Sequence, residues 1–161
     1  MRRPSVLFLA LVAAVIPMSA SAAPAAPARD GRAEPVDVQL VAAGSDWCLT
    51  SYLTELPCAP TGPYRWRFRP VGGGAFELLS VRADRCLSMP GGTRVEGARA
   101  GLASCAALPS RRWELRDSAG ATAEVVNTRS GLCLRIESGV AVQGSCTRGP
   151  SRWTVRVLHR Y

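Results

Sequence analysis

The sequence Asp84-Arg85-Cys86-Leu87-Ser88 precedes Cys105 and Arg111-Arg112-Trp113-Glu114-Leu115, and this order of residue types occurs three times in the 161-residue chain. Each copy has a β-prone start, which is Phe76-Glu77-Leu78-Leu79 in this one, then a Cys-Leu pair, a second cysteine and an Arg-Trp pair. The first copy consists of Val38-Gln39-Leu40-Val41, Asp46-Trp47-Cys48-Leu49-Thr50, Cys58 and Tyr64-Arg65-Trp66-Arg67-Phe68. The third copy consists of Ala123-Glu124-Val125-Val126, Gly131-Leu132-Cys133-Leu134-Arg135, Cys146 and Ser151-Arg152-Trp153-Thr154-Val155. This register predicts a threefold internal repeat.

The six cysteines form an even set in a short chain, which in an oxidising compartment indicates disulfides. Six cysteines allow fifteen pairings in principle. The repeat selects the pairing within each copy, which is Cys48 with Cys58, Cys86 with Cys105, and Cys133 with Cys146. Zinc sites typically use close Cys-x-x-Cys pairs, whereas the nearest cysteines here are ten positions apart. We therefore expect three disulfides, no metal and no cofactor.

Apolar and polar residues alternate at the ends of the copies, as in residues 65–68 and 152–157, and this period of two predicts β-strands. Glycine-rich turns such as residues 71–74 and 90–92 separate the apolar segments. One copy is too short to bury its own apolar face. We therefore expect an all-β fold in which the three copies share one core, with equivalent places for Trp66, Trp113 and Trp153.

The amino-terminal residues predict export. Arg2 and Arg3 precede an apolar run over residues 6–16, and Ala20-Ser21-Ala22 supplies the small residues of a cleavage site. We expect residues 1–22 to be a signal peptide, residues 23–35 a disordered Ala/Pro-rich leader and residues 36–161 the folded domain. An apolar run of eleven residues is too short to span a bilayer as a helix, so we expect a secreted protein, extracellular or periplasmic, without a membrane span.

Residues 126–134, Val-Asn-Thr-Arg-Ser-Gly-Leu-Cys-Leu, resemble the strand, turn and Cys-Leu signature of the ricin B-type β-trefoil lectins. The tryptophan of each Arg-Trp pair stands where that family carries the tryptophan of its Gln-x-Trp motif. The resemblance covers nearly all of residues 36–161. It implies a β-trefoil, a barrel of six strands capped by three hairpins with pseudo-threefold symmetry and a disulfide within each repeat.

The sequence departs from that family where sugars are bound. Galactose-binding members usually carry an Asp two positions after the first cysteine of a repeat, and an aromatic platform shortly before the second. The Asp positions here hold Thr50, Ser88 and Arg135. Residues 101–104 and 142–145, which precede the second cysteine in the second and third repeats, contain no aromatic residue. The glutamine of Gln-x-Trp is replaced by Tyr64, Arg111 and Ser151.

Two groups of residues remain as candidates for carbohydrate binding. In the first repeat, hydroxyl groups and a stacking face come from Thr50, Tyr52 and Tyr64, although Tyr64 suits the rim of the core equally well. In the third repeat, polar groups that suit an acidic or polar ligand come from Arg135, Glu137 and Gln143. Arg135 and Glu137 lie two residues apart, so a surface ion pair between them is the alternative.

The net charge and the remaining motifs limit the classes of ligand and activity that we expect. The chain has twenty Arg, no Lys and a formal net charge of +8, which suits polyanions or simply a solvated surface. The single histidine, His159, has no evident nucleophile or carboxylate partner, so we expect no enzyme activity. We expect a monomer that binds a carbohydrate or glycoconjugate and no nucleic acid. The alternative is a scaffold for protein recognition, such as a toxin-delivery subunit, an inhibitor or an envelope-associated partner.

Overall fold

The computed structural model describes residues 36–147 and 150–158. The predicted signal peptide and leader, residues 1–35, lie outside the described residues, as does His159. No helix in the described part of the chain is both long and apolar enough to cross a membrane.

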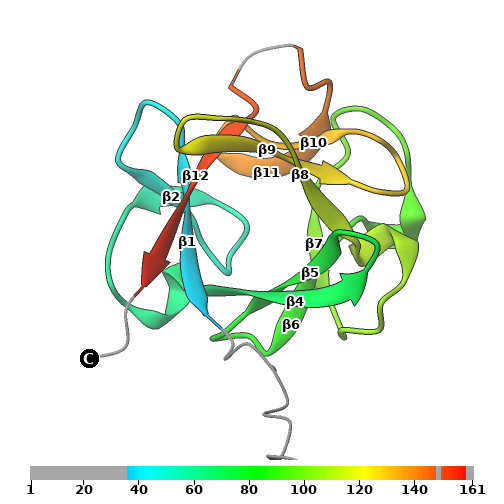
Figure 1. Ribbon diagram of the computed structural model, residues 1–161, viewed down its shortest axis with the longest axis horizontal. Helices are drawn as coiled ribbons and strands as arrows, with labels where there is room; N and C mark the ends of the chain where they lie inside the picture. Colours follow the sequence, from blue (N-terminus) through cyan, green and yellow to red (C-terminus); the bar gives the residue numbers. More distant parts are fainter. Residues whose placement is uncertain (1–35, 148–149, 159–161) are drawn as a thin grey trace, which may run out of the picture. The chain divides into compact units, whose positions relative to one another are not determined.

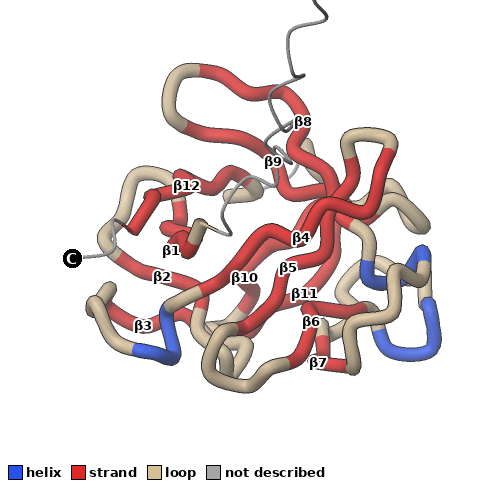
Figure 2. The backbone as a smooth tube through the Cα atoms, turned by 60° about the horizontal axis from the view of Figure 1, so that its bottom comes forward, coloured by secondary structure: helices blue, strands red, loops and turns tan. Residues whose placement is uncertain are grey.

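Twelve β-strands and three short 3-10 helices make up the described structure (Figure 1). The strands are β1 (Asp37–Ala42), β2 (Trp47–Leu49), β3 (Glu55–Pro57), β4 (Trp66–Gly72), β5 (Ala75–Ser80), β6 (Arg85–Ser88), β7 (Gly101–Ala103), β8 (Trp113–Ala119), β9 (Thr122–Asn127), β10 (Cys133–Glu137), β11 (Val140–Gly144) and β12 (Arg152–Leu158). The helices, which lie in the connections, are η1 (Gly62–Tyr64), η2 (Pro90–Gly92) and η3 (Pro109–Arg111) (Figure 2). The predicted all-β class is confirmed.

Six of the strands close into a barrel. The antiparallel pairs β1–β4, β4–β5, β5–β8, β8–β9, β9–β12 and β12–β1 form an unbroken ring, which Figure 1 shows around its centre. The three hairpins β2–β3, β6–β7 and β10–β11 pair with β1, β5 and β9, respectively. This arrangement repeats three times, one unit for each copy in the sequence, so the predicted β-trefoil is confirmed.

The three repeated tryptophans fill equivalent positions in the core. Trp66, Trp113 and Trp153 are 0%, 0% and 2% exposed. Their indole N–H groups donate hydrogen bonds of 3.0, 3.1 and 2.9 Å to the backbone carbonyls of Leu49, Leu87 and Leu134. Each acceptor is the leucine of the Cys-Leu pair in the same repeat. The sequence register therefore corresponds to one hydrogen bond that is built three times.

The three disulfides join the predicted pairs. Cys48 is bonded to Cys58, Cys86 to Cys105, and Cys133 to Cys146, with sequence separations of 10, 19 and 13 residues. The first cysteine of each pair is fully buried beside the leucine that accepts the tryptophan hydrogen bond. Each disulfide therefore ties one hairpin to the part of the core that its own repeat supplies.

A buried carboxylate at the start of β1 holds two barrel strands together. The side chain of Asp37 is 2% exposed and pairs with Arg65 at 2.6 Å and Arg67 at 2.7 Å, one oxygen to each guanidinium. Burial raises the pKa of Asp37, but hydrogen bonds and charges from Arg67 and Arg65 outweigh it, so the pKa lies below its ordinary value of 3.8. The folded state therefore favours the ionised carboxylate.

The Asp37→Asn variant should lose about 1–3 kcal/mol of unfolding free energy at neutral pH, since both guanidiniums lose a charged acceptor. A lowered pKa stabilises the fold above the ordinary pKa of 3.8, and this stabilisation disappears as the pH falls through the folded-state value. The difference between wild type and variant should therefore stay constant down to about pH 5 and shrink below about pH 4. Urea unfolding across this range measures it. A difference that does not change with pH would contradict the ionised pair.

Candidate functional site

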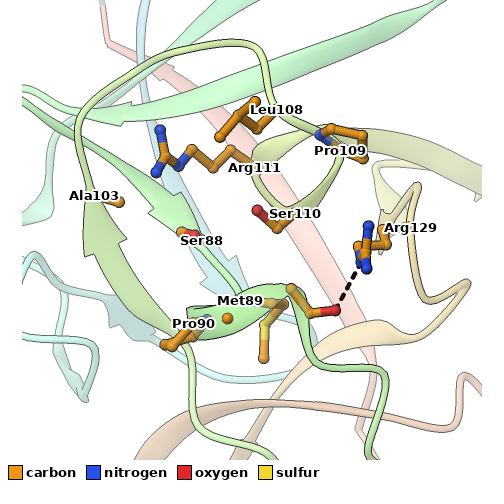
Figure 3. Close-up of a pocket in the computed structure, with 11 residues that line it drawn as sticks. Ser88, Met89, Pro90, Ala103, Leu108, Pro109, Ser110, Arg111 and Arg129 are labelled. Carbon is orange, nitrogen blue, oxygen red and sulfur yellow. Dashed lines mark hydrogen bonds between the residues drawn. The ribbon is translucent and has the colours of Figure 1, made fainter.

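A surface pocket of about 410 Å³ lies in the second repeat, where η2 and η3 face each other (Figure 3). Its walls come from the end of β6, both short helices, the end of β7 and the turn after β9. The lining residues are Ser88, Met89, Pro90, Gly91, Gly92, Ala103, Leu108, Pro109, Ser110, Arg111 and Arg129. The volume lies within the range typical of small-ligand sites, roughly 300–1,000 Å³.

Local sequence sets the shape of this pocket. A proline begins each of the two short helices, because its fixed φ suits the first helical position and its missing N–H costs nothing there. The two turns are held together by a 2.9 Å hydrogen bond from the Met89 N–H to the Ser110 carbonyl. Gly92 has a φ of +66°, and a Cβ there would lie 2.9 Å from the Nε of Arg129. The positive φ therefore favours glycine, and any larger residue would displace the Arg129 side chain.

Two arginines supply all the charge of the pocket lining. Arg111 in η3 donates from Nη1 to the Ser104 carbonyl at 2.5 Å. Arg129 belongs to the third repeat and donates from Nε to the Gly92 carbonyl at 2.7 Å, the contact drawn in Figure 3. Its backbone N–H is held in turn by the Asn127 side chain at 3.1 Å. Both guanidiniums are thus anchored by protein carbonyls.

The pocket coincides with the sugar-site positions of the resemblance. Ser88 stands where galactose-binding members carry their aspartate, and it lines the pocket with 5% of its surface exposed. Ala103, two residues before the second cysteine, lines the wall in the stretch expected to hold the aromatic platform. Arg111 replaces the glutamine of Gln-x-Trp. The second repeat therefore retains a cavity with altered chemistry.

The candidates of the first repeat have different surroundings. Thr50 is fully buried, and its hydroxyl contacts the Thr54 carbonyl at 2.9 Å and the Thr54 hydroxyl at 3.1 Å. Tyr52 is 58% exposed, with the Arg82 guanidinium 5.5 Å from its ring centre. Tyr64 is half-buried in η1. Of these three side chains, Tyr52 alone presents a large exposed surface, and sugar binding here stays a prediction.

The candidates of the third repeat bond to the protein itself. Gln143 is fully buried: its amide N–H₂ donates to the Thr93 and Val95 carbonyls at 3.0 Å each, and its amide oxygen accepts from Ser130 at 2.8 Å. Arg135 is 8% exposed and pairs with Glu137 at 3.4 Å, so the alternative ion pair is present. A ligand would have to replace these bonds. Sugar binding by this group also stays a prediction.

The pocket of the second repeat was not among the sites predicted from the sequence. The family pattern has an aspartate two positions after the first cysteine and an aromatic platform before the second, and this repeat has Ser88 and the non-aromatic residues 101–104 at those positions. Arg129 lies 37 residues from its acceptor Gly92. The available signal was the pair of proline-led turns, Pro90-Gly91-Gly92 and Pro109-Ser110-Arg111, on either side of Cys105.

Two clusters of acidic and sulfur groups lie beside the disulfides. Glu77 lies near Cys86 and Cys105, and Glu124 lies near Cys133 and Cys146. These four sulfurs are bonded in disulfides and are not thiolates. Glu77 also accepts hydrogen bonds from the backbone N–H groups of residues 106 and 107 at 3.0 and 2.7 Å. Its cluster therefore ties the connection after β7 to the barrel.

Comparison with known proteins identifies the family. Residues 64–155, more than half of the chain, match the family described as ricin-type beta-trefoil lectin domain-like. The chain belongs to this family. No curated protein matches the chain in sequence.

Solved structures share the fold of this ricin-type lectin-like domain. The designed threefold-symmetric protein ThreeFoil is similar with a TM-score of 0.71 and 21% identity, covering 76% of this chain and 99% of ThreeFoil. The exo-beta-1,3-galactanase 1,3Gal43A from Clostridium thermocellum is similar with a TM-score of 0.65 and 16% identity, covering 76% of this chain and 30% of the galactanase. The Polyporus squamosus lectin is similar with a TM-score of 0.65 and 12% identity, covering 76% of this chain and 49% of the lectin. The chain thus spans about half or less of the latter two proteins.

Proposed function

We propose that this protein is an exported, non-catalytic carbohydrate-binding domain whose binding site is the pocket of the second repeat. The observation that carries the proposal is the placement of a cavity of about 410 Å³ at the positions of Ser88, Ala103 and Arg111. Those are the positions that the family resemblance marks for sugar recognition. The serine hydroxyls and guanidiniums of the lining offer hydrogen bonds to a polar ligand, while Pro90, Leu108 and Pro109 offer apolar surface.

The similar structures support this proposal. The Polyporus squamosus lectin is described in complex with the epitope Neu5Aca2-6Galb1-4GlcNAc, and another β-trefoil, SeviL, with the asialo-GM1 saccharide. The galactanase is matched over only 30% of its length, so its activity is not carried over to this chain.

A glycan array of neutral and acidic sugars, followed by calorimetry on each hit, tests the function. Backbone amide NMR then locates the site. We expect ligand-dependent shifts at residues 88–92 and 109–111, while the corresponding turns of the first and third repeats serve as internal controls. The absence of binding to any sugar would contradict the proposal, and chemical-shift changes confined to another repeat would locate the binding site in that repeat.

Export is part of the same proposal and rests on the amino-terminal sequence together with the three disulfides, which form in oxidising compartments. Mass spectrometry of protein from the culture medium should find a chain that begins at Ala23. A chain that retains residues 1–22 inside the cell would contradict it.

Protein recognition is the second candidate function. It is favoured by the loss of a carboxylate at Ser88 and of a ring at Ala103, which removes the usual sugar contacts while the fold is kept. This function predicts a purified complex of fixed stoichiometry with a co-exported protein and an empty glycan array. A positive array with sugar shifts in the pocket would exclude it.

A further inference from the structure

The charge of the pocket is opposite to that of a site built around an aspartate. Its two charged lining residues are Arg111 and Arg129, and no Asp or Glu lines it. The aspartate position itself is occupied by Ser88, which is neutral. A ligand in this pocket therefore meets two guanidiniums and no carboxylate.

Both guanidiniums are fixed in place and yet keep donors available. Arg111 uses Nη1 and Arg129 uses Nε for a backbone carbonyl. Within the described part of the chain, neither forms an ion pair, and the two Nη groups of Arg129 have no acceptor. Guanidinium donors held in this way favour a carboxylate or sulfate, whose oxygens accept two parallel hydrogen bonds.

Comparison of the three repeats shows that the fold does not require an arginine here. Asn127 pairs with Trp113, and Arg129 follows two residues later. The equivalent residue after the Trp66–Ser80 pair is Arg82, whereas the equivalent after the Trp153–Ala42 pair is Gly44. The barrel therefore forms equally with a glycine at the third of these equivalent positions. Arg82 likewise lies at the surface of the preceding repeat, over the ring of Tyr52.

We infer that the second-repeat pocket binds an acidic saccharide, whose carboxylate or sulfate groups accept hydrogen bonds from Arg111 and Arg129 on opposite sides of the pocket. This inference rests on the proposed function and narrows it to one class of glycan. The sugar ring lies against the apolar wall formed by Pro90, Leu108 and Pro109. In an aspartate site, the protein carboxylate accepts hydrogen bonds from sugar hydroxyls. Here the direction is reversed, and the anion of the ligand accepts hydrogen bonds from the guanidiniums.

Matched ligands test the inference on the wild-type protein. Calorimetry compares trigalacturonate with its methyl ester, and galactose 6-sulfate with galactose, so each pair differs in charge on one sugar skeleton. We expect the acidic member of at least one pair to bind roughly tenfold tighter or better, the effect of one hydrogen bond to a charged group. The carboxylate and sulfate arms identify which anion is preferred.

Variants locate the effect. We expect Arg111→Gln and Arg129→Gln each to lower the affinity for the acidic ligand roughly tenfold. The control is Arg85→Gln, the same charge change at an exposed arginine of β6 outside the pocket lining, and it should change affinity less than twofold. Thermal unfolding checks that each variant is folded.

Three outcomes would overturn the inference. Equal binding of the acidic and neutral members, with NMR shifts in the pocket, contradicts the acidic preference and leaves carbohydrate binding intact. An equal loss of affinity in Arg85→Gln shows diffuse attraction to the basic surface. If no sugar binds, the proposed function fails together with the inference.

Discussion

Replacing Trp113 with alanine is expected to lower the free energy of unfolding by about 3–5 kcal/mol, the range for large aromatic side chains removed from a core. The indole is fully buried, and its N–H donates to the Leu87 carbonyl at 3.1 Å. The variant therefore leaves a cavity and a buried acceptor without its donor. Denaturant unfolding monitored by circular dichroism measures the loss.

Two further variants separate the causes. Trp113→Phe keeps most of the ring and removes the N–H, so it should cost about 1–3 kcal/mol for the unpaired carbonyl. Trp47→Ala is the control, because this tryptophan is 45% exposed and should cost at most about 1 kcal/mol. A Trp113→Ala variant that is no less stable than Trp47→Ala would contradict the shared core.

The repeat makes this prediction transferable. Trp66 and Trp153 make the same hydrogen bond to the leucine of their own Cys-Leu pair. Their alanine variants should therefore lose similar amounts, and a double variant should deviate from additivity because the three indoles belong to one buried cluster.

The features that could be predicted from the sequence are those that one repeat contains within itself. The tryptophan hydrogen bond spans 17 to 26 residues and each disulfide 10 to 19, so both lie within a copy and recur in the sequence. The Arg135–Glu137 pair could also be anticipated, because residues two apart on a strand lie on the same face.

The features that could not be predicted depend on contacts between repeats. Gln143 looked like a ligand-binding amide, but its acceptors Thr93 and Val95 lie 50 and 48 residues away in the second repeat. Arg129 reaches the pocket in the same way, from a turn of the third repeat. Such contacts depend on how the three copies close on one another, which no single motif in the sequence encodes.

The core and the pocket lining also obey different constraints. The residue after each first cysteine is a buried leucine in all three repeats, because its side chain belongs to the hydrophobic core, while its backbone carbonyl accepts the indole N–H. The next residue is Thr50, Ser88 or Arg135, and it differs in size and charge without disturbing the barrel. The residue directly after the first cysteine therefore helps to predict the fold, whereas the residue after that one determines the ligand chemistry.

Removing the Cys86–Cys105 disulfide with a double alanine variant should cost about 3 kcal/mol, because the unfolded chain regains the freedom of a closed loop. Its cysteines are 19 residues apart, against 10 for Cys48–Cys58. The chain-entropy relation then makes the longer loop roughly 0.6 kcal/mol more stabilising. Denaturant unfolding of the two double variants under the same conditions measures the difference. A larger loss from the shorter loop would show that local packing outweighs loop entropy.

The longer loop has a second expected effect, on the pocket. Residues 86–105 include η2 and β7, which supply Pro90, Gly91, Gly92 and Ala103 to its wall. Ser104, next to the disulfide, accepts the hydrogen bond that anchors Arg111. The variant without Cys86–Cys105 should therefore bind an acidic saccharide more weakly even where it remains folded. The variant without Cys48–Cys58 should keep wild-type affinity, because that disulfide lies in another repeat.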